Sequence, residues 1–160
     1  MRAIDVMRSS FATVKSSTSL LDAARLLLET NQRGLPVLDD DGTLVGIISE
    51  GDFLHRDELG VMPPAGNWLE QILGIEEETP ARERMRALRV GEIMTANPVC
   101  VAEDASVADV VEAMDLRDVA QLPVVSAGKL IGMISRFELI AALERRLSHN
   151  HSDPQAVCTA

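Results

Sequence analysis

The chain has 160 residues, of which 46% are apolar, and a formal net charge of −10. This length and apolar content allow one compact domain, or two half-domains that share a core, and they argue against wholesale disorder. The negative charge opposes general binding to nucleic acid or anionic lipid, because cationic side chains supply most of that affinity. We therefore expect neither nucleic acid nor membrane among the partners.

The two cysteines show no regular spacing, and Met1 to Met7 lacks the apolar stretch of a signal peptide. No apolar run approaches the roughly 20 residues that a membrane span needs. We therefore expect a cytoplasmic protein without disulfides.

The first third of the chain has the pattern strand, helix, strand, strand, helix. Ser19 or Thr18 can cap the first helix, whose apolar residues recur at helical spacing, and Gly34 is predicted to close it. An Asp-Gly pair ending at Gly42 is typical of a hairpin turn, since such turns need a positive φ. The predicted elements are a strand at 12–14, a helix at 20–28, strands at 35–38 and 44–49, and a short helix opening at 50–52.

This pattern occurs twice. Residues 4–7 match 91–94, 19–24 match 106–111, and 35–37 match 122–124. After one residue is dropped in the turn, 42–49 match 128–135. One copy is too small to bury its apolar face well, so we expect the copies to pack sheet to sheet about a pseudo-two-fold axis.

The duplication divides the chain into four parts. The first repeat occupies 1–56, an insert 57–88, the second repeat 89–147 and a flexible tail 148–160. In the insert, the segment around Trp68 is amphipathic and 81–88 is predicted as a charged helix. The tail contains two histidines and a cysteine, but a frayed segment does not hold metal ligands in a fixed geometry, so no metal site is predicted.

The most informative string is Gly-Ile-Ile-Ser-Glu-Gly-Asp at 46–52, with Gly-Met-Ile-Ser-Arg-Phe-Glu at 132–138 as its second copy. Each follows a Leu-Pro-Val segment and a turn that contains glycine. Together they resemble the CBS domain family, named after cystathionine β-synthase, over roughly two-thirds of the chain. The resemblance implies an α+β fold of two β-α-β-β-α CBS repeats, and a regulatory, non-catalytic protein.

The chemistry of these residues suits a nucleoside. A carboxylate can accept hydrogen bonds from both hydroxyls of a ribose, and Asp52 stands where a strand passes into a helix. Ser49 can add a polar contact, and Arg33 is placed to reach a phosphate. Asp52 is equally plausible as a helix cap, and Ser49 as a partner of backbone groups.

The resemblance further implies that each site is shared between the copies, so that early residues of one copy face the ribose-binding residues of the other. The first predicted adenine-nucleotide site comprises Arg33, Gly34, Leu35, Pro36, Val37, Ile47, Ser49, Asp52, Thr95, Asn97 and Val99. A second, weaker site comprises Ser10, Ala12, Gln121, Leu122, Pro123, Met133, Ser135, Arg136 and Glu138. It is weaker because Glu138 replaces the aspartate and Ala120 replaces the arginine.

The family implies AMP, ADP or ATP as the ligand, with AMP first; S-adenosylmethionine or a dinucleotide stays open, and no cofactor is required. It also implies a homodimer that forms a disc of four repeats, and an effector protein. Two other hypotheses remain: a structural or dimerisation module that has lost its ligand and binds a partner protein, and a small hydrolase, for which a set of catalytic groups is lacking.

Overall fold

The computed structural model describes residues 1–54 and 85–149. The predicted amphipathic segment around Trp68 and most of the tail lie outside this part of the chain. Residues 85–87, near the end of the helix predicted at 81–88, are helical. Within the two described ranges, no helix is long and apolar enough to cross a membrane.

The predicted order of strands and helices is present in both copies. The first copy contains α1 (Ala3–Val6), β1 (Val14–Lys15), α2 (Leu20–Thr30), β2 (Gly34–Leu38), β3 (Leu44–Ser49) and α3 (Glu50–Leu54). The second contains α6 (Val90–Ile93), β4 (Thr95–Ala96), β5 (Val101–Ala102), α7 (Val107–Arg117), β6 (Gln121–Ser126), β7 (Lys129–Ser135) and α8 (Arg136–His149).

The ends of α2 show one correct prediction and one error. Ser19 caps the helix, and its hydroxyl accepts a hydrogen bond from the Asp22 N–H at 3.1 Å. The helix ends at Asn31, whose φ of 51° is left-handed, so the prediction that Gly34 closes it is wrong. Asparagine tolerates this conformation better than most residues, which leaves Gly34 to begin β2.

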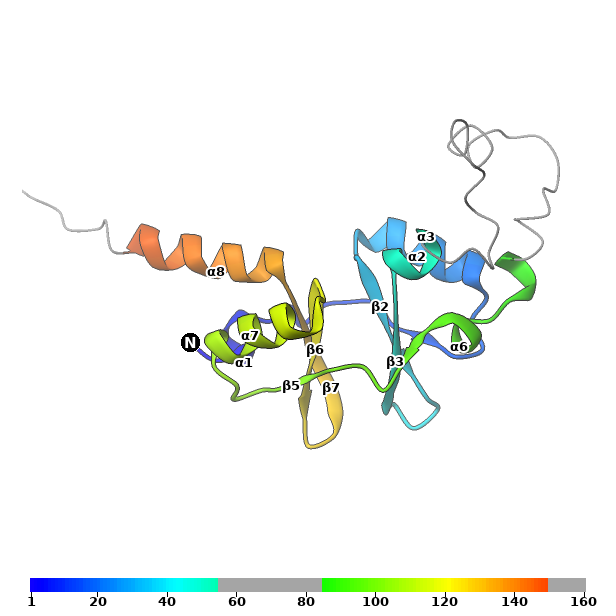
Figure 1. Ribbon diagram of the computed structural model, residues 1–160, viewed down its shortest axis with the longest axis horizontal. Coiled ribbons are helices and arrows are strands. Elements are labelled where there is room, and N and C mark those ends of the chain that lie inside the picture. Colours follow the sequence, from blue (N-terminus) through cyan, green and yellow to red (C-terminus); the bar gives the residue numbers. More distant parts are fainter. Residues whose placement is uncertain (55–84, 150–160) are drawn as a thin grey trace, which may run out of the picture.

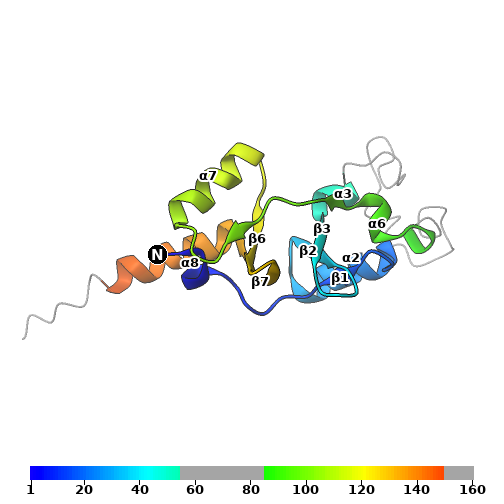
Figure 2. The same ribbon diagram turned by 90° about the horizontal axis from the view of Figure 1, so that it is seen from below.

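Two sheets face each other at the centre of the molecule, with helices on their outer sides (Figures 1 and 2). The first has the order β1-β2-β3-β4 and the second β5-β6-β7. In each sheet, the short first strand runs parallel to its neighbour, and the following hairpin is antiparallel. The prediction of an α+β fold with two repeats packed sheet to sheet is confirmed.

The repeats exchange their N-terminal segments, which the sequence pattern did not indicate. Val90 and Ile93 of α6 are buried in the core of the first repeat, beside Leu20 and Leu35. Reciprocally, Ala3 and Val6 of α1 are buried in the core of the second repeat. Each structural half is therefore completed by the other copy.

Equivalent residues of the two copies meet each other, as a pseudo-two-fold axis requires. Thr43 and Lys129 occupy matching positions, and they form an isolated β-bridge. Gly34 and Gln121 also match, and a Cβ atom added to Gly34 would lie 1.7 Å from Nε2 of Gln121. A side chain at this position would therefore have to displace the amide end of Gln121, whereas the backbone angles of Gly34 make no special demand.

A methionine from each exchanged segment packs on a glycine of the opposite repeat. The Sδ atom of Met94 would lie 2.3 Å from a Cβ at Gly46, and that of Met7 would lie 2.3 Å from a Cβ at Gly132. Larger residues at the two glycines would displace these methionines. The contacts place the segment after α6 beside β3 and the segment after α1 beside β7.

Candidate functional site

The junction between β3 and α3 is built around the carboxylate of Asp52. Its Oδ2 atom accepts hydrogen bonds from the Ser49 backbone N–H at 2.8 Å and from the Ser49 hydroxyl at 3.1 Å. Asp52 and Ser49 are both half-buried. Asp52 is the third residue of α3 and so does not cap the helix; its carboxylate instead accepts from the N–H of Ser49, the residue before the helix, which holds the side chain at the end of β3.

The second repeat reproduces this arrangement with a longer side chain. Oε2 of Glu138 accepts from the Ser135 backbone N–H at 2.8 Å and also from the Ser135 hydroxyl. The extra methylene therefore does not prevent the carboxylate from reaching its serine. The two junctions share these two hydrogen bonds.

The exchanged segment lies along the strand that leads to Asp52. Thr95 pairs with Ile47, and the Asn97 N–H donates to the Val45 carbonyl at 3.2 Å. Side chains alternate along a strand, and Ile48 points into the core, so Ile47 is directed to the opposite face. The structure thus places Thr95 and Asn97, both exposed, next to β3.

The residues of β2 divide between the two faces of the sheet. Leu35 and Val37 are fully buried in the core of the first repeat. Only their backbone groups could meet a ligand, because their side chains point away from the second repeat. Pro36 is the register partner of Ile47 and shares its face.

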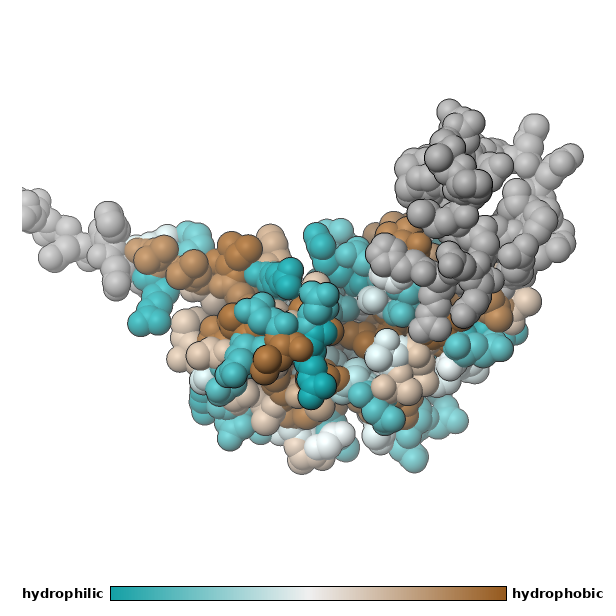
Figure 3. All heavy atoms as spheres, in the orientation of Figure 1, coloured by the Kyte–Doolittle hydropathy of each residue, from teal (hydrophilic) through white to brown (hydrophobic). Residues whose placement is uncertain are grey.

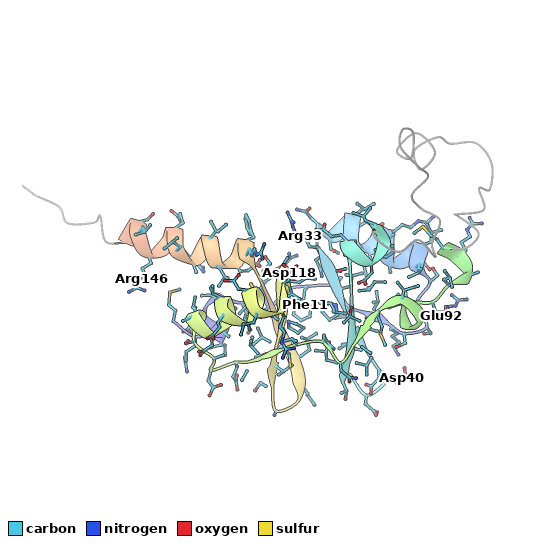
Figure 4. The ribbon with its side chains drawn as sticks, in the orientation of Figure 1. Phe11, Arg33, Asp40, Glu92, Asp118 and Arg146 are labelled. Atoms are coloured by element: carbon cyan, nitrogen blue, oxygen red, sulfur yellow. The ribbon has the colours of Figure 1, made fainter. Side chains whose placement is uncertain are left out.

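Arg33 immediately precedes β2 and has an acidic neighbour that sequence reasoning did not single out. Its Nη1 atom lies 3.5 Å from Oε1 of Glu50, and both side chains are exposed. Figure 4 shows Arg33 before the start of β2, on the side of the first repeat that faces the second. The hairpin predicted from the sequence brings 33 and 50 to the same end of two strands, but the sequence did not indicate the register, Gly34 opposite Ser49, that makes them neighbours.

The second candidate site differs from the first in packing. Met133, the equivalent of Ile47, is buried and forms backbone hydrogen bonds with Arg8 at 2.8 and 3.0 Å. The Gln121 Nε2 atom is buried, and no hydrogen-bond partner was found for it among the described residues. Ala12 is tied to its own repeat, because its backbone N–H and carbonyl both bond the side chain of Gln32.

An apolar face lies away from both junctions. Four side chains of α8, Phe137, Ile140, Leu143 and Leu147, are between 57% and 75% exposed and follow one face of the helix. Figure 3 shows this face over α8. A separate cavity of about 820 Å³ is lined by residues of α7 together with Met1 and Arg146, and none of these four apolar side chains lines it.

Within the described residues, no group of three or more His, Cys, Asp or Glu side chains could hold a metal ion. His151, Asp153 and Cys158 of the tail lie outside that part of the chain.

Comparison with known proteins places this architecture among CBS domain pairs. The sequence profile of the CBS domain matches residues 3–58 and 90–145. The protein MJ1426 of Methanocaldococcus jannaschii is 32% identical over 150 residues, which are 87% of this chain and 89% of that protein. The chloroplastic CBS domain-containing protein CBSX2 of Arabidopsis thaliana is 33% identical over 84% of this chain and 59% of its own length.

Solved structures agree with this assignment. The crystal structure of CBSX2 in complex with AMP superimposes with a TM-score of 0.68 at 33% identity, covering 91% of this chain and 98% of that one. The CBS domain pair of MJ0100, in complex with 5′-methylthioadenosine and S-adenosyl-L-methionine, has a TM-score of 0.67 at 22% identity and shares the fold.

Proposed function

Since the chain belongs to the CBS domain family and carries two copies of the domain, we propose that it is a regulatory module that binds an adenine nucleotide between them. AMP is the first candidate, because the similar CBSX2 was crystallised with AMP. ADP, ATP and S-adenosylmethionine are further candidates. The module has no catalytic role in this proposal.

The observation that carries the proposal is the position of Asp52. Its carboxylate is held at the end of β3 by two hydrogen bonds from Ser49, both to the same oxygen atom. A carboxylate has about four acceptor positions, so ribose hydroxyls can share it. Ile47 and Thr95 lie side by side on the approach to this point and offer an apolar and a polar wall for the base.

The direct test is isothermal titration of the purified chain with adenosine, AMP, ADP, ATP and S-adenosylmethionine, after mass spectrometry of any ligand carried through purification. A ligand at 100 times its Kd stabilises the folded state by about 2.7 kcal/mol, which raises the Tm of a chain of this size by roughly 5 to 10 °C. Absence of both heat and thermal shift at millimolar concentrations of every ligand would end the proposal.

A second candidate function is a structural module that keeps the fold without a ligand. The buried position of Met133 and the loss of an arginine at Ala120 favour it for the second site. If it holds for the whole chain, Asp52→Ala leaves partner binding unchanged, and added nucleotide has no effect on stability. Turnover of a nucleotide by the pure protein would instead revive the hydrolase hypothesis.

We also propose that two chains associate into a disc of four repeats through the apolar face of α8. Ile140 and Leu143 are 64% and 57% exposed on this face, and an exposed apolar face of this kind is typical of a protein–protein interface. Ligand binding then shifts the balance between two arrangements of the dimer, to the extent that the ligand binds them with different affinities. An effector protein would respond to that shift.

A further inference from the structure

The first repeat carries an ion pair at the entrance to its proposed site. Gly34 and Ser49 are partners in the β2–β3 ladder, so the residues just outside that ladder, Arg33 and Glu50, are neighbours. The Glu50 N–H donates to the Arg33 carbonyl at 3.0 Å, and the charged groups lie 3.5 Å apart. The backbone therefore keeps the carboxylate beside the guanidinium.

This ion pair is not required by the fold, as the second repeat shows. The equivalents of Arg33 and Glu50 are Ala120 and Arg136. The same backbone hydrogen bond is present between them, from the Arg136 N–H to the Ala120 carbonyl at 3.3 Å. The fold thus accepts a cation at Arg136 where the first repeat has an anion at Glu50. The negative charge of Glu50 is therefore expected to affect ligand binding and not folding.

The charge at this entrance disfavours ligands with many phosphates. In the proposed site, Arg33 is the group that faces the phosphate, and the Glu50 carboxylate 3.5 Å away offsets part of its charge. A phosphate that approaches Arg33 must share it with a carboxylate, and each added phosphate charge increases the repulsion. The net charge of −10 over the whole chain acts in the same direction.

We propose that Glu50 is a specificity-determining residue that limits the number of phosphates, so that the first site favours adenosine and AMP over ATP. This inference rests on the proposed nucleotide-binding function. Glu50 then changes the relative affinities of ligands that share the same base and ribose and differ in their number of phosphates. The ion pair is exposed, so its effect on affinity is modest.

The test compares the wild-type chain with Glu50→Gln, Glu50→Arg and Asp41→Asn by titration with adenosine, AMP and ATP. The buffer contains EDTA and low salt, so that neither Mg²⁺ nor screening masks the ligand charge. Asp41→Asn is the matched control, because it removes the same charge in the turn at the opposite end of β3. Glu50→Arg copies the residue that the second repeat uses.

Glu50→Gln is expected to bind AMP about two to five times more tightly than the wild type, and to gain more for ATP. Glu50→Arg should gain more still, while adenosine binds all four proteins equally. Asp41→Asn should match the wild type for each ligand. If AMP and adenosine bind but the ratio of ATP to AMP affinity is the same in every variant, the role of Glu50 is refuted while the nucleotide site stands. If no variant binds any of the three ligands, the proposed function fails and this inference fails with it.

Discussion

Replacement of Asp52 by alanine separates its proposed ligand contact from its local structural role, because Glu138 offers a matched control. Both carboxylates accept a bond from a serine backbone N–H at 2.8 Å and a second bond from the same serine's hydroxyl. Asp52→Ala and Glu138→Ala each remove this pair of bonds to the serine three residues earlier. Each should destabilise the ligand-free chain by about 1 to 3 kcal/mol.

The two variants should differ in ligand binding. A hydrogen bond to a charged acceptor contributes roughly 1.5 to 3 kcal/mol, so loss of the ribose contact weakens binding at least about tenfold. We expect Asp52→Ala to lose at least that factor for AMP, and Glu138→Ala to lose less than about threefold. Titration calorimetry measures the affinities, and urea unfolding of the ligand-free chains checks that the structural losses are equal.

A ligand that lacks the 2′-hydroxyl completes the comparison. If Asp52 accepts from this hydroxyl, 2′-deoxy-AMP binds the wild type more weakly than AMP does, but binds Asp52→Ala as well as AMP does. Equal losses of AMP affinity in Asp52→Ala and Glu138→Ala would refute the reasoning, and so would an undiminished penalty for 2′-deoxy-AMP in Asp52→Ala.

Three further outcomes follow from the structure. Ile140→Glu places a charge on the apolar face of α8 and should convert a dimer to a monomer. Light scattering after size exclusion measures the mass, and an unchanged mass would exclude α8 as the interface. Gly34→Ala should destabilise the chain by at most about 1 kcal/mol, because the added Cβ displaces the amide end of Gln121. Gln121→Ala in the same chain should recover part of that loss, and additive effects in urea unfolding would contradict the contact. Hydrogen bonds from the Ser106 hydroxyl and backbone hold the pKa of Asp109 below its usual value of 3.8. The stability that Asp109 contributes is therefore complete above pH 3.8, and it is lost as the pH falls through the lower pKa of the folded state. Ser106→Ala should make stability less dependent on pH in that acid range, and an unchanged dependence in urea unfolding would show that the hydroxyl is not responsible.

Local patterns predicted the long helix and the hairpin of each repeat, but not α1, α6 or β4. Ser19 caps α2 as its side chain and position predict, and the turn at Gly42 has the expected positive φ of 80°. These features depend on interactions between residues close in the chain, so the sequence contains the information that decides them. The duplication added the expectation of two sheets packed about an axis, because matched copies have the same apolar face to cover.

The tertiary structure decided which residues of different segments meet. The exchange of α1 and α6 between the repeats depends on packing such as Met94 on Gly46, which joins residues almost 50 positions apart and leaves no periodic signal. The same holds for Gly34, which had the local features of a helix end and proved to be the contact point of Gln121. Glu50 became relevant only when the ladder placed it beside Arg33. Hydrogen bonds and periodicity within a segment act at short range and can be inferred from neighbours in the chain, whereas a contact across the pseudo-two-fold axis exists only after both halves have folded and packed.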